Sequence, residues 1–115
     1  MNILGLIKDL VLSTQVRNAC EAKGYKYASG RNEERFNQAL EELKPDRVII
    51  DLNADGIDPF VAIEKAKSLI PAENILCFFS HVNGELADKA LAMGLLKEQI
   101  FIRSKFFSNL GAVIQ

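Results

Sequence analysis

Short apolar runs alternate along the chain with longer segments in which apolar residues recur at helical spacing. The apolar or alternating runs predict strands at residues 3–7, 25–29, 47–52, 74–79 and 99–102. The segments with three- and four-residue spacing predict helices at residues 13–23, 32–44, 59–70, 83–93 and 104–113. Strands without any charge are typical of a parallel sheet that is covered on both faces. The pattern therefore predicts a doubly wound α/β domain with right-handed crossovers.

Capping and breaking residues support these boundaries. Ser13 or Thr14 is the expected N-cap of the first helix, and Gly24 is its expected stop. Asp58 followed by Pro59 is a typical helix start. Gly5, inside the first strand, predicts close packing against the backbone. No repeat or linker interrupts the pattern, so residues 1–115 are expected to form a single domain.

Composition narrows the classes of partner. The chain has 115 residues, of which 49% are hydrophobic and 25% are charged, and its formal net charge is −1. This balance gives no electrostatic reason to expect a nucleic acid or an anionic membrane as partner. No apolar run reaches the ~18–20 residues of a membrane span, and the start lacks the features of a signal peptide. Cys20 and Cys77 have no metal-ligand spacing and are expected to be reduced, buried thiols of a cytoplasmic protein.

Polar side chains follow the strands at the edge where an open parallel sheet places its chemistry. Strand 47–52 delivers Asp51 to this edge. The candidate pocket residues after the other strands are Lys8, Asp9, Ser80, His81, Arg103, Ser104 and Lys105.

The run from Val48 to Asp51, with Gly56 following, the hydroxyl of Ser80 and a basic residue after the last strand resemble the receiver domain of two-component response regulators. The resemblance spans essentially the whole chain. It implies a flavodoxin-like, five-stranded parallel sheet with strand order 2-1-3-4-5. It also implies that Asp51 accepts a phosphoryl group from a histidine kinase, that Ser80 contacts the phosphoryl oxygens, and that Arg103 or Lys105 neutralises charge.

One part of the resemblance fails after the first strand, where the family carries two acids that bind Mg²⁺. The matching positions are Ile7 and Lys8 in one register, or Lys8 and Asp9 in the other, and neither gives two acids. Lys8 places a positive charge where the metal would be held. We therefore expect no metal and no cofactor, and we expect Lys8 or a basic group after the last strand to pair with Asp51. Mg²⁺ is expected only if Asp51 is a working phosphoacceptor.

Residues 78–82 and 103–106, with Gly94 between them, also resemble a group of stand-alone, divergent receiver-like proteins of bacteria. Those pseudo-receivers are named mainly by their fold. The resemblance implies a signalling module that acts through protein contacts.

The same residues have structural interpretations. Asp51 is a loop-capping or ion-paired carboxylate in one of them. Ser80 and His81 form a small anion site with loop amides, or Ser80 caps the following helix. Arg103 and Lys105 bind phosphate, or extend into solvent while Ser104 caps the last helix.

The last helix is apolar over too wide an arc for one buried stripe. Its candidate interaction residues are Phe106, Phe107, Leu110 and Ile114. Phe107 and Ile114 are expected to stay exposed unless a partner or a second copy of the chain covers them.

Together these features predict a protein that is not an enzyme, since a single histidine without a positioned nucleophile does not make a hydrolase. The leading hypothesis is a response-regulator-like module that binds another protein, such as a histidine kinase or another regulator, or forms a homodimer. The alternatives are a working phosphoreceiver with Asp51 as acceptor, and a domain that binds a small anion or ligand at the strand ends.

Overall fold

The computed structural model describes all residues from Met1 to Gln115. The strands are β1 (Asn2–Leu6), β2 (Lys26–Ser29), β3 (Arg47–Asp51), β4 (Ile75–Phe79) and β5 (Ile100–Ile102). The α-helices are α1 (Leu10–Ala22), α2 (Glu33–Leu43), α3 (Pro59–Lys67), α4 (Gly84–Ala92), α5 (Arg103–Ser108) and α6 (Leu110–Val113). Short 3-10 turns at Ala72–Asn74 and Lys97–Gln99 precede β4 and β5. None of the helices has the length and apolar character that crossing a membrane requires.

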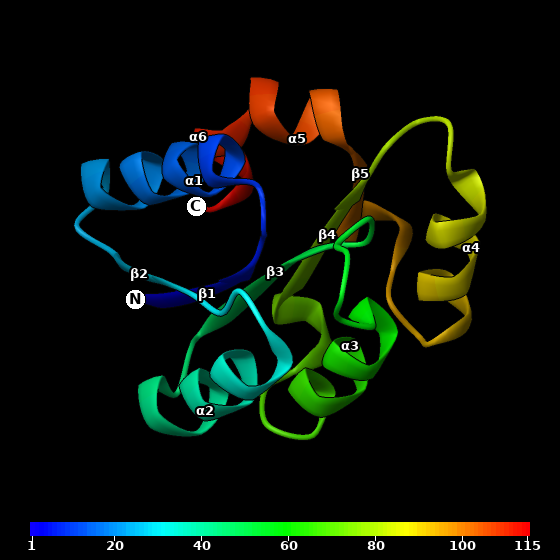
Figure 1. Cartoon of the computed structure of the whole chain (residues 1–115). Helices are drawn as coiled ribbons and strands as arrows, with labels where there is room; N and C mark the ends of the chain where they lie inside the picture. The colour runs from blue at the N-terminus through cyan, green and yellow to red at the C-terminus, as the bar shows by residue number, and fades with distance from the viewer.

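The strands form one parallel sheet in the order β2-β1-β3-β4-β5, which confirms the predicted topology. Helices α1, α5 and α6 cover one face, and α2, α3 and α4 cover the other (Figure 1). In the sheet register, Leu6 lies beside Ile50 and Asp51 lies beside Phe78. The first residues after β1, β3 and β4 are therefore brought to one edge.

Each face of the sheet has its own apolar core, which explains why the inner strands carry almost no polar residues. On one face, Leu4 and Ile50 pack with Phe36 of α2 and Ile63 of α3. On the other face, the core consists of Ile3, Ile7, Val16, Cys20, Ile49, Leu76, Phe78, Phe106 and Ile114. Burying both faces is the arrangement that a parallel sheet requires.

Cys20 and Cys77 are both buried and unpaired, as predicted. Burial raises the pKa of Cys20 to about 11 and that of Cys77 to about 12. Both side chains are therefore neutral thiols at physiological pH, and they contribute as small apolar groups.

The first helix begins earlier than predicted. Asp9, and not Ser13 or Thr14, is the N-cap, and its carboxylate accepts a hydrogen bond of 3.0 Å from the Leu12 N–H. Ser13 lies within the helix, where its hydroxyl is 3.0 Å from the hydroxyl of Tyr27. The prediction placed the start of this helix too late because Leu10 and Val11, the first helical residues, are apolar but exposed.

The last helix is not continuous. It ends at Ser108, and a second, four-residue helix begins at Leu110. Ile102 precedes α5 without a side-chain cap, so the interpretation of Ser104 as the capping residue is wrong.

This break directs the apolar residues of both short helices inward. Phe106 and Ile114 are fully buried, so neither belongs to the candidate interaction surface, and the prediction that Ile114 stays exposed is wrong. Phe107 and Leu110 are half-buried and pack against the same core. The rings of Phe106 and Phe107 lie 5.0 and 5.1 Å from that of Phe78, so the aromatic residues close this end of the core.

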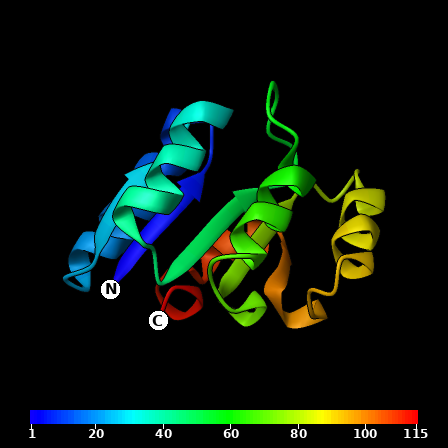
Figure 2. The same cartoon turned by 90° about the horizontal axis from the view of Figure 1, so that it is seen from below.

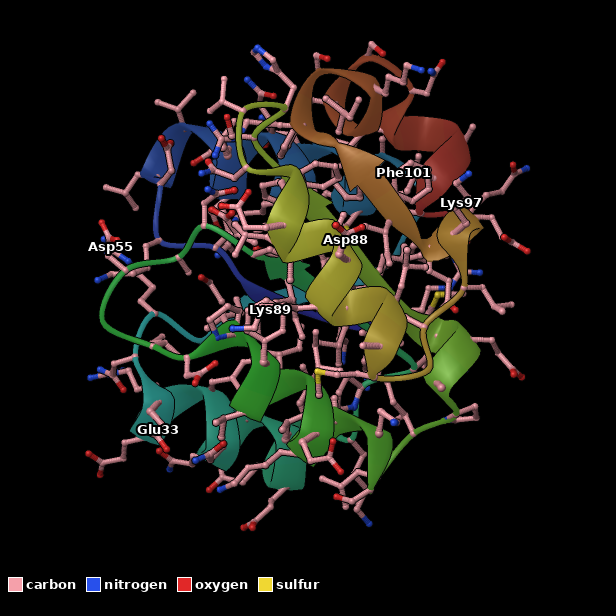
Figure 3. The ribbon with its side chains drawn as sticks, turned by 90° about the vertical axis from the view of Figure 1, so that its right-hand side faces the viewer. Glu33, Asp55, Asp88, Lys89, Lys97 and Phe101 are labelled. Carbon is pink, nitrogen blue, oxygen red and sulfur yellow. The ribbon has the colours of Figure 1, made fainter.

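Among the four longer helices, α1 to α4, helix α4 has the fewest buried residues, since only Ala90 is buried. Two contacts connect it to α3. The Lys67 ammonium donates a hydrogen bond of 2.6 Å to the Met93 carbonyl, and the Lys89 ammonium lies 4.6 Å from the centre of the Phe60 ring. Figure 3 shows Lys89 extending from α4 toward α3, and Figure 2 shows α4 beyond α3 at one end of the molecule.

Candidate functional site

The carboxyl ends of the strands surround a hollow of about 220 Å³. Its lining comes from the loop after β1, the start of α1, the end of β3 with its loop, and the residue after β5. The lining residues are Lys8, Asp9, Leu12, Asp51, Asn53, Ala54, Asp55 and Arg103. The structure thus brings Lys8, Asp9, Asp51 and Arg103 together, as the strand-end pattern predicted. We call this space the Asp51 hollow.

Asp51 is the last residue of β3, and only 6% of it is exposed. Its carboxylate accepts a hydrogen bond of 2.9 Å from the Asn53 N–H. Burial is the largest influence on this group and raises its pKa. The Asn53 hydrogen bond and the charge of Arg103 lower that pKa, whereas Asp9 and Asp55 raise it.

Arg103 is the cation that acts on Asp51 by its charge, but no hydrogen bond or ion pair joins the two side chains, so the predicted pairing with Asp51 is not formed. Arg103 follows β5 directly and lines the Asp51 hollow, whereas Lys105 is exposed and lines no part of it. Arg103 is also the only cation among the main influences on the pKa of Asp51. Its Nε atom is buried and has no hydrogen-bond partner. Of the two basic residues between which the sequence left the choice open, only Arg103 lines the Asp51 hollow.

Lys8 occupies the rim of the same hollow. Its side chain is exposed, and its ammonium group lies 3.2 Å from the position that a Cβ atom on Gly56 would take. Gly56 has a φ of +76°, a conformation that favours glycine. Lys8 therefore extends along the loop after β3, and Figure 3 shows Asp55 of this loop at the outer edge of the molecule.

The acid pair that the family resemblance implies after β1 is incomplete in this chain, although Asp9, Asp51 and Asp55 all line the hollow. Mg²⁺ prefers octahedral oxygen ligands, including one or two carboxylates. Ile7 is part of the apolar core, Lys8 is cationic, and one carboxylate oxygen of Asp9 is engaged in capping α1. No group of three or more His, Cys, Asp or Glu side chains is arranged to hold a metal.

Asn53 is a central residue of the site that the sequence did not indicate. Its side-chain carbonyl accepts a hydrogen bond of 2.8 Å from the Ser80 N–H, and its side-chain amide donates one of 2.9 Å to the Asn83 side chain. The Asn53 side chain therefore connects the loop after β3 to the loop after β4 by hydrogen bonds. An asparagine in a loop is too common to suggest this role without knowledge of the sheet order.

A second hollow, of about 460 Å³, adjoins the first. It is lined by Leu12, Gln15, Ser80, His81, Ile102, Arg103, Ser104 and Phe107. The two hollows share Leu12 and Arg103. The predicted pocket residues therefore divide between two spaces, with Ser80, His81 and Ser104 away from Asp51. We call the second space the Ser80 hollow.

Ser80 does not cap α4, which corrects one of the structural interpretations. Asn83 is the N-cap residue of that helix, and no side chain caps the helix there. Ser80 instead contributes its carbonyl oxygen, which accepts a hydrogen bond of 2.8 Å from the Asn83 N–H.

No protein-family profile matches the chain, and no curated protein is detectably similar to it in sequence. Solved structures do match. Full-length FixJ from B. japonicum has a TM-score of 0.77 at 21% identity, over 98% of this chain and 55% of that protein. The signal receiver domain of the DNA-binding response regulator merR from Colwellia psychrerythraea 34H gives 0.76 at 20% identity, over 99% and 98% of the two chains.

The BeF3-activated N-terminal receiver domain of Klebsiella pneumoniae RstA gives 0.75 at 15% identity, over 100% and 99% of the chains. This chain therefore corresponds to about half of full-length FixJ and to almost all of the isolated receiver domains. It has the fold of response regulator receiver domains.

Proposed function

We propose that this chain is a receiver-like signalling module that acts through protein contacts and does not depend on Mg²⁺-assisted phosphorylation. The single observation that carries the proposal is the Asp51 hollow. In it, Arg103 faces the carboxylate at the end of β3, and Lys8 and Asp9 stand where an acid pair would hold a metal.

Charge explains why these features belong together. A carboxylate that attacks a phosphoryl group needs a cation that holds both reactants and offsets their negative charge. Arg103 offers one positive charge, which already acts on Asp51. Lys8 adds a second charge but no oxygen ligand. The hollow thus supplies positive charge to Asp51 but lacks the pair of acids that would complete a metal site for phosphoryl transfer.

Exposed apolar side chains near the same edge support a protein partner. Leu10 and Val11 begin α1 and are 61% and 66% exposed, and Val82, in the loop after β4, is 71% exposed. Apolar residues that stay in solvent at a functional edge favour contact with another protein. The partner class is another signalling protein or a second copy of this chain.

The proposal is tested by incubating the protein with Mg²⁺ and acetyl phosphate and measuring its intact mass. We expect no gain of a phosphoryl group, while a receiver domain that is known to be phosphorylated gains one under the same conditions. Beryllofluoride with Mg²⁺ should likewise leave the amide NMR spectrum unchanged.

A gain-of-function variant sharpens the test. Lys8→Asp removes the cation and places an acid beside Asp9. We expect this variant to respond to Mg²⁺ in its NMR spectrum where the natural protein does not. The exposed Lys105→Asp makes the same charge change outside the hollow and should remain unresponsive.

A working phosphoreceiver is the second candidate function. The convergence of Asp51 and Arg103 on one hollow, with Ser80 after the neighbouring strand, favours it. A phosphoryl mass gain that Asp51→Asn abolishes and Asp55→Asn retains would establish this function and refute the first.

A further inference from the structure

We propose that the groove between α2 and α3 is a self-association surface, on which a second copy of this chain docks about a two-fold axis. This inference does not rest on the proposed function, because no residue of the groove lines the Asp51 hollow or the Ser80 hollow. The two helices lie side by side on the face of the sheet opposite α1, α5 and α6 (Figure 1).

The groove runs along the whole length of the two helices. Three adjoining hollows, of about 60, 210 and 490 Å³, follow one another between them. The first two hollows share Asn37, and the last two share Leu40 and Glu41. They begin beside Glu33, the first residue of α2, and end beside Lys44, the residue that follows this helix. We call this space the α2–α3 groove.

Apolar side chains line the α2–α3 groove at both of its ends. Phe36 and Leu40 of α2 line it from the buried core. On the side of α3, Val61 lines the first hollow and is 45% exposed, and Leu69 lines the last one and is 57% exposed. Large apolar side chains that stay in solvent along one groove favour the docking of another protein surface.

The charged residues of the groove follow an order that identifies the partner. Glu33 and Asp58 line the first hollow, at the amino ends of the two helices. Lys44 lines the last hollow, beyond the carboxyl end of α2. Between these ends, Glu41 of α2 and Lys65 of α3 line the same hollow. The groove is thus acidic at one end, basic at the other, and carries one charge of each sign near its middle.

This order is complementary to itself when a second copy is turned end for end. The acidic end of one copy then faces Lys44 of the other, and Glu41 faces Lys65 in both directions across the two-fold axis. The same rotation brings Val61 of one copy toward Leu69 of the other. A two-fold interface uses the same patch on both subunits, so one self-complementary pattern satisfies both sides. An unrelated protein would have to carry this pattern independently, whereas a second copy carries it by symmetry.

The first test is sedimentation equilibrium of the full chain, from micromolar to millimolar concentrations. We expect a reversible dimer with a dissociation constant in the micromolar range. Leu69→Ser should weaken the dimer by about tenfold or more, since each interface loses two apolar contacts. Leu96→Ser is the matched control, because Leu96 is 55% exposed and lies outside the groove. It should change the dissociation constant by less than about twofold.

An exchange of charges tests the two-fold arrangement itself. Glu41→Lys alone and Lys65→Glu alone should each weaken self-association by about tenfold or more, because like charges then face each other. An equimolar mixture of these two variants should dimerise to within about threefold of the natural protein, because every facing pair is again of opposite sign.

Thermal melts that match that of the natural protein establish that the four variants are folded. A dimer that Leu69→Ser weakens, that Leu96→Ser leaves intact and that the mixed charge variants restore supports the proposal. A monomer at every concentration overturns it. Equal weakening by Leu69→Ser and Leu96→Ser also overturns it, because the dimer would then use another surface. Failure of the mixture to recover overturns the two-fold pairing of Glu41 with Lys65 on which the proposal depends.

Discussion

Asn53 and Ser80 are joined by a hydrogen bond of 2.8 Å from the Ser80 backbone N–H to the Asn53 side-chain carbonyl. The backbone N–H of the same asparagine donates to Asp51, and its side-chain amide donates to Asn83. One residue therefore fixes the acidic loop after β3 to the loop after β4.

We predict that Asn53→Ala destabilises the protein by about 1–2 kcal/mol, because the Ser80 N–H and the Asn83 side chain lose their partners. Urea unfolding measures the change. Asn74→Ala is the matched control, since Asn74 is similarly half-buried but its side chain makes no hydrogen bond. Equal losses for the two variants would show that the Asn53 bridge contributes nothing.

Asp51 should make stability depend on pH. Burial raises its pKa above the ordinary value of 3.8, so the folded protein binds the proton more tightly than the unfolded chain. The ionised carboxylate therefore lowers stability above its folded pKa, and this loss disappears as the pH falls through that pKa toward 3.8. Asp51→Asn should thus be more stable than the natural protein at neutral pH, by a margin that shrinks on acidification.

Urea unfolding of both proteins from neutral pH to about pH 4 measures this margin. Asp55→Asn is the control, because Asp55 is exposed in the same loop. If Asp51→Asn is instead less stable at neutral pH, the attraction of Arg103 outweighs the cost of burial.

Gly5 and Tyr27 should show strong coupling. The Tyr27 hydroxyl is the atom nearest to where a Cβ atom on Gly5 would lie, and two ring carbons follow at 3.0 Å. Gly5→Ala should therefore cost about 1–3 kcal/mol through overpacking. Tyr27→Phe removes the obstructing oxygen and should recover part of this loss in the double variant. As a single substitution, Tyr27→Phe should cost about 1 kcal/mol, because it removes the hydrogen bond with Ser13.

Double-mutant unfolding measures that coupling, and additive losses would contradict the proposed contact. Gly111→Ala serves as the control for glycine replacement. No atom lies within 4 Å of its added Cβ, so it should change stability by less than about 0.5 kcal/mol.

The sheet was predictable because its strands are apolar on both faces, and a parallel arrangement is the common way to bury such strands. The strand ends then placed Asp51 and the basic residues at one edge. The choice between Arg103 and Lys105 was not predictable. β5 has three residues, and α5 follows it without a loop, so a shift of two residues leaves the apolar pattern almost unchanged.

The end of the chain misled the prediction for a related reason. Its apolar residues cover too wide an arc to be buried by one helix. We interpreted the residues outside the buried stripe as a surface for a partner. The structure breaks the segment at Asn109, with φ and ψ of −124° and 30°, so that Phe106 and Ile114 both enter the core. No proline lies at this break, and Gly111 falls two residues beyond it, inside α6, so the packing against Phe78 and α1 is what reveals it.

Helix α4 should depend on its contact with α3. The Lys67 ammonium donates to the carbonyl of Met93, the residue that ends α4, and a positive charge at a helix C-terminus is favourable. Lys67→Met keeps the aliphatic chain and removes the donor. We expect about tenfold faster hydrogen exchange in the last turn of α4, since this helix has few buried contacts to hold it closed.

Lys65→Met removes the same charge from an exposed position of α3 and should leave that exchange unchanged. Equal acceleration in both variants would mean that net charge, and not the Met93 hydrogen bond, holds the end of α4.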